Sequence, residues 1–268
     1  MKTRLQYWPC PLKLSPGFRA SSMAALLLIS GCALLHKRLP YKDPDRLVSV
    51  VKVTSAGEEP VLDTDFLAWR NQSKTLGPIA AYVYGGFTLA DKSEPERIPS
   101  ALVSSDFFPA LGVQPVLGRV FLSEECQTGK NHVVVISYDL WQRRFGGDPN
   151  LIGKTITLDL EKRIVIGVMP EDFRFPNHRD MWAPLAFDDE SLRLESNSNG
   201  LEVIARLKPS VTIQQAQADM NAVAGKLERE YPAPNGSRDI KVIPLRETVL
   251  KMKIIRPVNP TAEAGKEK

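Results

Sequence analysis

The stretch LEVIARLKPSVTIQQAQADMNAVAGKLEREY, residues 201–231, carries the clearest local signal in the chain. Its first seven residues alternate apolar and polar side chains, which predicts a half-buried β-strand. Thr212 and Gln215 follow as a T-x-x-Q capping box, in which each side chain bonds the other residue's backbone N–H at the start of a helix. The helix itself is predicted by apolar residues that recur at helical spacing, namely Ile213, Ala216, Met220, Val223, Ala224, Leu227 and Tyr231.

Pro232 ends this helix, and IKVIP at 240–244 predicts a closing strand. A strand–helix–strand unit needs further sheet to bury its faces. The beginning of the body can supply it, with predicted strands at 47–53, 87–90 and 97–104 and short helices after Asp63 or Thr64 and after Ser105-Asp106, the second ended by Gly112. We therefore expect the two ends of the body to fold together around its middle.

The middle of the body, about 118–197, is richer in β-structure. VVVI at 133–136 is typical of a strand buried on both faces, and Ser137 caps a helix over 138–145. Strands at 155–158 and 163–168 form a hairpin; its turn has no glycine, which favours a loop longer than a two-residue primed turn. The pairs Gly85-Gly86 and Gly146-Gly147 indicate turns.

Composition and charge exclude several classes of protein. With 268 residues, 43% hydrophobic and 25% charged, the chain is neither disordered, collagen-like nor a polytopic membrane protein. The net charge of +4 comes from the two ends, because residues 1–42 hold seven basic and no acidic residues, whereas 43–240 hold 21 basic and 28 acidic ones. A nucleic-acid partner is not expected, since its phosphates need cations on the folded body.

The N-terminus predicts an address or an anchor. MAALLLISGCALL at 23–35 is uncharged and follows a basic leader. It suits an uncleaved anchor or shortened membrane helix, a cleaved or lipidated signal, or a start-site artefact or buried helix. Ile29-Ser30-Gly31-Cys32 resembles a bacterial lipobox, which makes Cys32 a candidate lipidation site. Cys126 stands alone in the body, so no internal disulfide is expected.

No motif predicts catalysis, a cofactor or a metal. The chain lacks H-E-x-x-H, G-x-S-x-G, C-x-x-C and the phosphate-binding G-x-x-x-x-G-K-[ST]. His36, His132 and His178 lie far apart without ligand-spaced partners. The adjacent carboxylates of Glu124-Glu125 and of Asp188-Asp189-Glu190 are expected to be solvated. We therefore predict no catalytic, cofactor-binding or metal-binding residue.

Several strings in a fixed order carry a family resemblance. They are LPYKDPDRLV (39–48), VSSDFF (103–108), LGVQPVLGRVF (111–121), VVISYDLWQRRFGGDP (134–149), IGVMPEDFRFP (166–176) and ARLKP (205–209). Together they resemble the periplasmic core domain of MacB-type (FtsX-like) ABC transporter permeases, most closely the acidobacterial permease type. The resemblance covers roughly residues 39–250.

The resemblance implies an α+β fold of two parts. A porter-like α/β subdomain is expected from both ends of the segment, 44–117 and 199–250, with a β-rich subdomain, 118–198, inserted. The core domain, 39–250, is then flanked by an N-terminal leader and anchor or signal, 1–38, and a flexible tail, 251–268. Localisation in the inner membrane with the body in the periplasm is implied as well.

The resemblance also implies a non-enzymatic role in export or in the transmission of conformational change across the membrane. Its partners would be the permease membrane domain, a cytoplasmic ABC ATPase and a periplasmic adaptor, and the permease would be a homodimer. Nothing after Val249 resembles the later membrane helices of the family, so a truncated permease is expected. The alternative hypothesis is a free-standing secreted or lipid-anchored periplasmic binding protein with the same fold.

Overall fold

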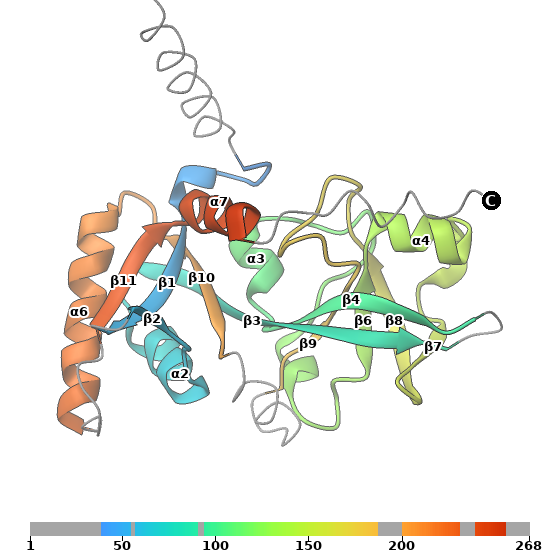
Figure 1. The fold of residues 1–268 in the computed structure, drawn as a ribbon, viewed down its shortest axis with the longest axis horizontal. Coiled ribbons are helices and arrows are strands. Elements are labelled where there is room, and N and C mark those ends of the chain that lie inside the picture. Colours follow the sequence, from blue (N-terminus) through green and yellow to red (C-terminus); the bar gives the residue numbers. More distant parts are fainter. Residues whose placement is uncertain (1–38, 55–56, 91–93, 187–199, 231–238, 256–268) are drawn as a thin grey trace, which may run out of the picture. The chain divides into compact units, whose positions relative to one another are not determined.

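The structure is a computed structural model that describes residues 39–54, 57–90, 94–186, 200–230 and 239–255 (Figure 1). The predicted leader with Cys32, Tyr231 with Pro232, and Asp188-Asp189-Glu190 lie outside the described residues. The strands are β1 (Leu47–Thr54), β2 (Gly57–Glu59), β3 (Leu76–Leu89), β4 (Glu96–Val103), β5 (Leu117–Gly118), β6 (Val133–Ile136), β7 (Thr155–Leu158), β8 (Glu161–Val168), β9 (Met181–Pro184), β10 (Glu202–Leu207) and β11 (Asp239–Pro244).

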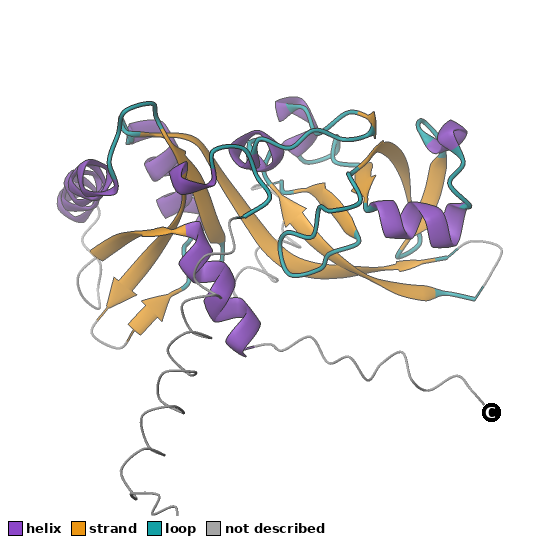
Figure 2. Cartoon of the chain, turned by 90° about the horizontal axis from the view of Figure 1, so that it is seen from above, coloured by secondary structure: helices purple, strands orange, loops and turns teal. Residues whose placement is uncertain are grey.

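Five α-helices lie beside these strands in the described residues (Figure 2, helices purple). The α-helices are α2 (Asp63–Gln72), α3 (Phe107–Leu111), α4 (Tyr138–Phe145), α6 (Ile213–Glu230) and α7 (Leu245–Ile255). Single 3₁₀ turns are η1 (Pro44–Arg46), η2 (Ser123–Cys126) and η3 (Pro149–Leu151). Within the described ranges, no helix is both long and apolar enough to cross a membrane.

All strands of the described residues belong to one mixed sheet. Its order is β11-β1-β10-β3-β4-β9-β6-β8-β5, with β2 added to β1 and β7 added to β3 and β8. The pairs β4–β9 and β6–β8 are parallel, and the other pairs are antiparallel. The predicted α+β fold class is confirmed.

The two ends of the body meet in this sheet. β10 lies between β1 and β3, with Leu47 opposite Arg206 and Ala205 opposite Ile79. β11 pairs with the other edge of β1, which places Val48 opposite Pro244. The strand that opens the body and the strand that closes it are therefore direct neighbours.

Two apolar cores lie along the described part of the sheet, beside a further buried cluster of aromatic side chains that includes Phe108 and Trp182. The first joins β1, β3, β10 and β11 to helices α2 and α6, through side chains such as Trp69 and Met220. The second joins β6, β7, β8 and β9 to α4, through side chains such as Leu140. The long hairpin of β3 and β4 contributes to both, because Ile79 packs in the first core and Leu89 in the second. The subdomain boundaries at 117/118 and 198/199 stay a prediction.

Local signals place most helix ends correctly. The predicted cap at Asp63 or Thr64 is wrong, because both residues lie inside α2, which begins directly after Leu62. At the start of α6, Gln215 Oε1 accepts the N–H of Thr212 at 2.8 Å, and the Thr212 hydroxyl accepts the N–H of Gln215 at 3.2 Å. The Ser137 hydroxyl accepts the N–H of Leu140 at the start of α4. Gly112 ends α3 in the left-handed conformation that glycine adopts most readily.

Glycines and turns account for two corrections. Gly85 and Gly86 lie inside β3 and not in a turn, because β3 runs through them in register with β4. The predicted long loop between β7 and β8 is wrong as well, because Leu158 pairs directly with Glu161. Asp159 (φ 46°) and Leu160 (φ 73°) make a two-residue turn with both residues left-handed, although neither is glycine.

Helix α7 has no counterpart among the predicted elements. It follows β11 directly and continues to Ile255, so it includes residues 251–255 of the predicted flexible tail. Pro244 precedes it, and Pro257 follows it outside the described residues. The buried Leu245 fixes its first turn to the body.

Candidate functional site

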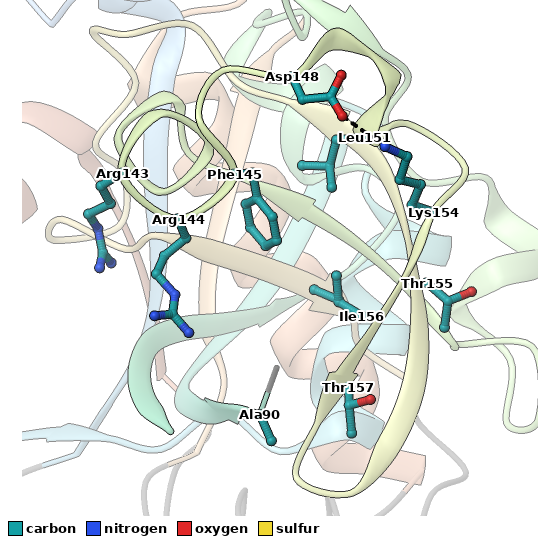
Figure 3. Close-up of a pocket in the computed structure, with 10 residues that line it drawn as sticks. All are labelled: Ala90, Arg143, Arg144, Phe145, Asp148, Leu151, Lys154, Thr155, Ile156 and Thr157. Carbon is teal, nitrogen blue, oxygen red and sulfur yellow. Dashed lines mark hydrogen bonds and ion pairs between the residues drawn. The ribbon is translucent and has the colours of Figure 1, made fainter. Parts of the chain in front are cut away.

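An open hollow of about 780 Å³ lies between α4 and β7 (Figure 3). It is lined by Ala90, Arg143, Arg144, Phe145, Asp148, Leu151, Lys154, Thr155, Ile156 and Thr157. Arginines come from the last turn of α4, and threonines come from β7. β7 pairs with β8 over its whole length and with β3 at Leu158, and the carbonyl of Thr157 accepts the N–H of Ala90 at 3.0 Å.

The cations of the hollow already have partners in the protein. Arg143 bonds Glu96 and, at 3.0 Å, Asp180, while Nε of Arg144 lies 3.4 Å from Glu96. Burial opposes the charge of Arg143, but the hydrogen bonds to Glu96 and Asp180 outweigh it and raise the pKa of the guanidinium. These contacts tie α4 to the starts of β4 and β9, and they leave little charge for an anionic ligand.

The remaining charges of the hollow behave in the same way. Lys154 donates to Asp148 at 2.8 Å, the contact drawn dashed in Figure 3. This hydrogen bond, followed by that from the N–H of Asn150, holds the pKa of Asp148 below its usual range. The pair fastens η3 to the start of β7, so its evident role is to hold the wall of the hollow.

The adjacent carboxylates Glu124 and Glu125 differ in their surroundings. Glu125 is not solvated as expected: it is 9% exposed, and Arg119 donates to both of its oxygens at 2.6 and 2.7 Å. Burial raises the pKa of Glu125, but Arg119 and the N–H of Leu122 outweigh it and lower the pKa overall. Glu124 is exposed. The pair therefore holds the 119–125 turn together.

The other candidate residues are dispersed. Cys126 is partly buried, and burial raises the pKa of its thiol to about 11, which keeps it protonated and unreactive. His132 lies before β6, and His178 lies in the loop between β8 and β9. Among the described residues, no group of three or more His, Cys, Asp or Glu could hold a metal ion.

A second site, built on Arg206, was not found from the sequence. Arg206 lies on β10 and is 8% exposed. Its guanidinium donates to three backbone carbonyls: Ala110 at 2.8 Å, Lys42 at 2.7 Å and Asp43 at 3.3 Å. The alternation of LEVIARL predicts a half-buried strand and assigns Arg206 to its polar face. That prediction is wrong, because β10 is buried on both faces from Val203 to Leu207. Ile204 on the same face is the one sequence signal that this face is covered too.

Arg46 makes the reciprocal contact. Its Nε and Nη2 both donate to the carbonyl of Leu207, at 3.0 and 2.6 Å. One arginine before β1 thus binds the end of β10, and one arginine on β10 binds the segment before β1. These contacts fasten the entry of the chain to the sheet.

Comparison with known families identifies the chain. Residues 22–223 match the family model described as the MacB-like periplasmic core domain. The match covers more than half of the chain, and the chain belongs to this family. It is thus a MacB-like periplasmic core domain, and the predicted family is confirmed, whereas the acidobacterial type stays a prediction. A search of curated proteins found no significant match.

Solved structures share the fold at low sequence identity. The periplasmic region of MacB from Actinobacillus actinomycetemcomitans has 12% identity and a TM-score of 0.58, covering 85% of this chain and 100% of that chain. The extracellular domain of the transporter YknZ from Gram-positive bacteria has 16% identity and a TM-score of 0.55, covering 74% and 99%. A domain of a protein described as a permease from Porphyromonas gingivalis has 16% identity and a TM-score of 0.57, covering 76% and 92%.

Proposed function

We propose that this chain is the non-enzymatic extracytoplasmic part of an ABC permease, and that it passes conformational change between the membrane and the periplasm. Its body lies in the periplasm, and residues 23–35 anchor it in the inner membrane. The partners are the permease membrane domain and a cytoplasmic ABC ATPase, with a periplasmic adaptor and a second copy of the permease. Export and signalling without transport are both served by such a role.

One observation carries the proposal. Val48 near the start of β1 pairs with Pro244 at the end of β11, so the chain enters β1 and leaves β11 at the same end of two neighbouring strands, directly before α7. A domain inserted between two membrane helices needs this arrangement, because both of its connections must reach the same membrane. Family membership over residues 22–223 supports the same placement.

The two cores suggest how such a body could move. We assign the porter-like part to 44–117 with 199–250 and the β-rich part to 118–198. The hairpin of β3 and β4 connects them, since its two halves pack in different cores. Bending in this hairpin, with release of Leu185 and Ala186 from the first core and of the Phe107–Phe175 contact, would let the two parts change their relative position.

The compartment can be tested with protease. Full-length chain expressed in a Gram-negative host should fractionate with membranes, and protease added to spheroplasts should digest the body. A cytosolic marker protein should stay intact in the same sample. A body that stays protected, or that fractionates with the cytosol, would contradict the proposal.

The same preparation tests the alternative of a free-standing lipid-anchored or secreted protein. The intact mass of the mature protein shows whether the chain starts at Cys32 with a lipid attached, starts at another new terminus, or keeps its leader. A retained leader is expected here.

Purified protein should also give no saturable, Mg²⁺-dependent heat with ATP in calorimetry, because its sequence lacks the phosphate-binding loop.

A further inference from the structure

Residues 40–46, here called the strap, lead the chain into β1 and touch three separate parts of the body. Arg46 at the end of the strap donates to the carbonyl of Leu207. The backbone carbonyls of Lys42 and Asp43, also in the strap, accept hydrogen bonds from Arg206. The guanidinium of Arg206 also bonds Ala110 in α3. A single buried side chain therefore joins the strap, α3 and β10.

The strap also approaches the end of α3 closely. Gly112 has φ +68°, and a Cβ placed on it would lie 2.9 Å from Cβ of Lys42 and 3.4 Å from Nη2 of Arg206. Only glycine fits there without displacing the strap. The C-terminal end of α3 is thus shaped to receive residue 42.

The third contact is aromatic and reaches the loop between β8 and β9. The ring of Tyr41 lies edge-on to Phe173 and Phe175, with centroids 6.2 and 6.3 Å away. Burial raises the pKa of its phenol well above the ordinary value. Phe173 in turn packs on Trp182 of β9 at 5.1 Å. Through Tyr41 the strap contacts the loop that leads into β9, a strand whose Met181 and Ala183 pack in the second core.

We infer that the strap is a fastened unit that couples the chain before residue 40 to both parts of the body at once, with Arg206 as its positioning residue. The inference rests on the proposed function for what the strap transmits, but the fastening itself is a property of the body. A pull on the strap moves α3 and β10 through Arg206 and moves the 169–180 loop through Tyr41. Arg206 touches no residue of the loop in the contacts described, but loosening it loosens the loop by two routes. One runs through the strap and Tyr41, and the other runs through α3, whose Phe107 and Phe108 pack on Phe175 and Phe173.

Hydrogen exchange on the purified full-length chain tests this inference. Two amides report on the strap: Arg46 donates to Asp43 at 3.0 Å, and Leu47 donates to Pro44. Two amides report on the loop: Phe173 donates to Pro170 at 3.0 Å, and His178 donates to Arg174 at 2.7 Å. All four are backbone bonds that need no substituted side chain.

Arg206→Lys is the informative variant. It keeps the charge, but an ammonium group cannot span Ala110 and the strap as the guanidinium fork does. Exchange at the strap amides should rise by about tenfold or more, because charge-assisted hydrogen bonds are lost. Exchange at Phe173 and His178 should rise with it. Tyr41→Leu should have the same pattern, and the double variant should add little to either single variant.

The control is Leu227→Ala, which weakens the first core away from the strap. The two variants are compared at denaturant concentrations that give them the same overall stability. Under these conditions Leu227→Ala should leave the exchange rates of the strap amides and of the loop amides at the values of the parent protein. The inference is overturned if Arg206→Lys affects the strap without the loop, if the two single variants act additively on separate amides, or if the control reproduces their pattern. Protease topology decides the proposed function separately, so the two can fail independently.

Discussion

The side-chain carbonyl of Gln217 accepts the backbone N–H of Val242 at 2.8 Å. The amide nitrogen of the same Gln217 donates to the carbonyl of Ile240 at 2.6 Å. β11 is the last strand on this side of the sheet, so these groups lie on its outer edge. Gln217 of α6 therefore takes the place of a further strand there, and it blocks pairing of that edge with another chain.

Gln217→Ala should expose this edge. The lost hydrogen bonds should lower the free energy of unfolding by about 1–2 kcal/mol. The freed edge should also promote self-association, since an unpaired strand edge is a template for pairing. Urea unfolding and concentration-dependent light scattering measure the two effects. Gln214→Ala, at an exposed position of the same helix, is the control. If both variants stay equally monomeric at high concentration, Gln217 does not protect the edge.

Leu160→Gly should stabilise the protein. Leu160 is 91% exposed and holds φ 73°, so it gains almost nothing from packing and bears the cost of a left-handed backbone. Glycine removes that cost but is more flexible when unfolded, which leaves an expected gain of about 0.5–1 kcal/mol in urea unfolding.

Asp159→Gly is the matched control in the same turn. Its carboxylate accepts the N–H of Thr88 at 2.8 Å and lies 3.9 Å from Arg97. Losing this acceptor should outweigh any relief of the backbone, so this variant should be less stable than the parent. A loss of stability in Leu160→Gly would show that the side chain has a role in the folded protein that its exposure hides.

Asp219 gives a prediction about pH. One carboxylate oxygen accepts from the hydroxyls of Ser73 and Thr75, at 2.9 and 2.7 Å, and from the amides of Lys74 and Thr75, at 2.8 and 3.1 Å. Burial raises the pKa of Asp219, but these hydrogen bonds outweigh it and lower the pKa overall. A lowered folded pKa stabilises the protein above the unfolded value of about 3.9, and this contribution is lost as the pH falls through the folded pKa.

Asp219→Asn should therefore cost about 1–2 kcal/mol at pH 7. At a pH below the folded pKa the difference from the parent should nearly vanish, because the parent carboxyl is then protonated too. Urea unfolding of both proteins across this range measures it. Asp172→Asn, an exposed carboxylate in the loop before β9, should change stability by less than about 0.5 kcal/mol at either pH. A difference that does not depend on pH would mean that the charge of Asp219 contributes nothing.

Sequence periodicity was sufficient where the signal is local. The capping box at Thr212 and Gln215 and the glycine after α3 depend only on residues within one turn of the helix end. The stripe of Ala216, Met220, Val223 and Leu227 is buried as its spacing predicts. These elements are decided by residues close together in the chain, so the sequence alone determines them.

Long-range contacts account for what could not be predicted. β3 continues through Gly85 and Gly86 because β4 pairs with them, and a Cβ on Gly86 would meet the Arg97 side chain at 2.9 Å. Arg206 bonds Ala110, which lies 96 positions away in the chain, and Lys42, which lies 164 positions away. The spacing of apolar residues along the chain cannot indicate hydrogen-bond partners that lie so far away in the sequence. The site therefore becomes visible only once the sheet brings β10 next to β1.

Paired core substitutions test whether the two cores are separate. Leu227 packs in the first core and Leu140 in the second, and both are buried. Replacing either with alanine should cost about 2–5 kcal/mol. Hydrogen exchange should accelerate mainly in the strands of the affected core. As a comparison outside the cores, Thr212→Ala removes the N-cap of α6 and should lower the free energy of unfolding by about 1 kcal/mol. Equal acceleration in both cores after either substitution would show one cooperative unit.

Deleting residues 201–250 should do more than remove one strand–helix–strand unit. β10 separates β1 from β3 in the sheet, and no pairing links β1 to β3 directly. Without β10 and β11, β1 loses both of its long neighbours, and α2 loses the core that α6 completes. We expect 44–117 to lose its cooperative unfolding, while 118–198 with the distal half of the β3–β4 hairpin keeps the second core.

Dispersed amide shifts in NMR should then persist for β6, β7 and β8 and collapse for β1. If β1 and α2 keep dispersed shifts and unfold cooperatively in denaturant, the first part folds without its C-terminal half, and the division into 44–117 plus 199–250 is wrong.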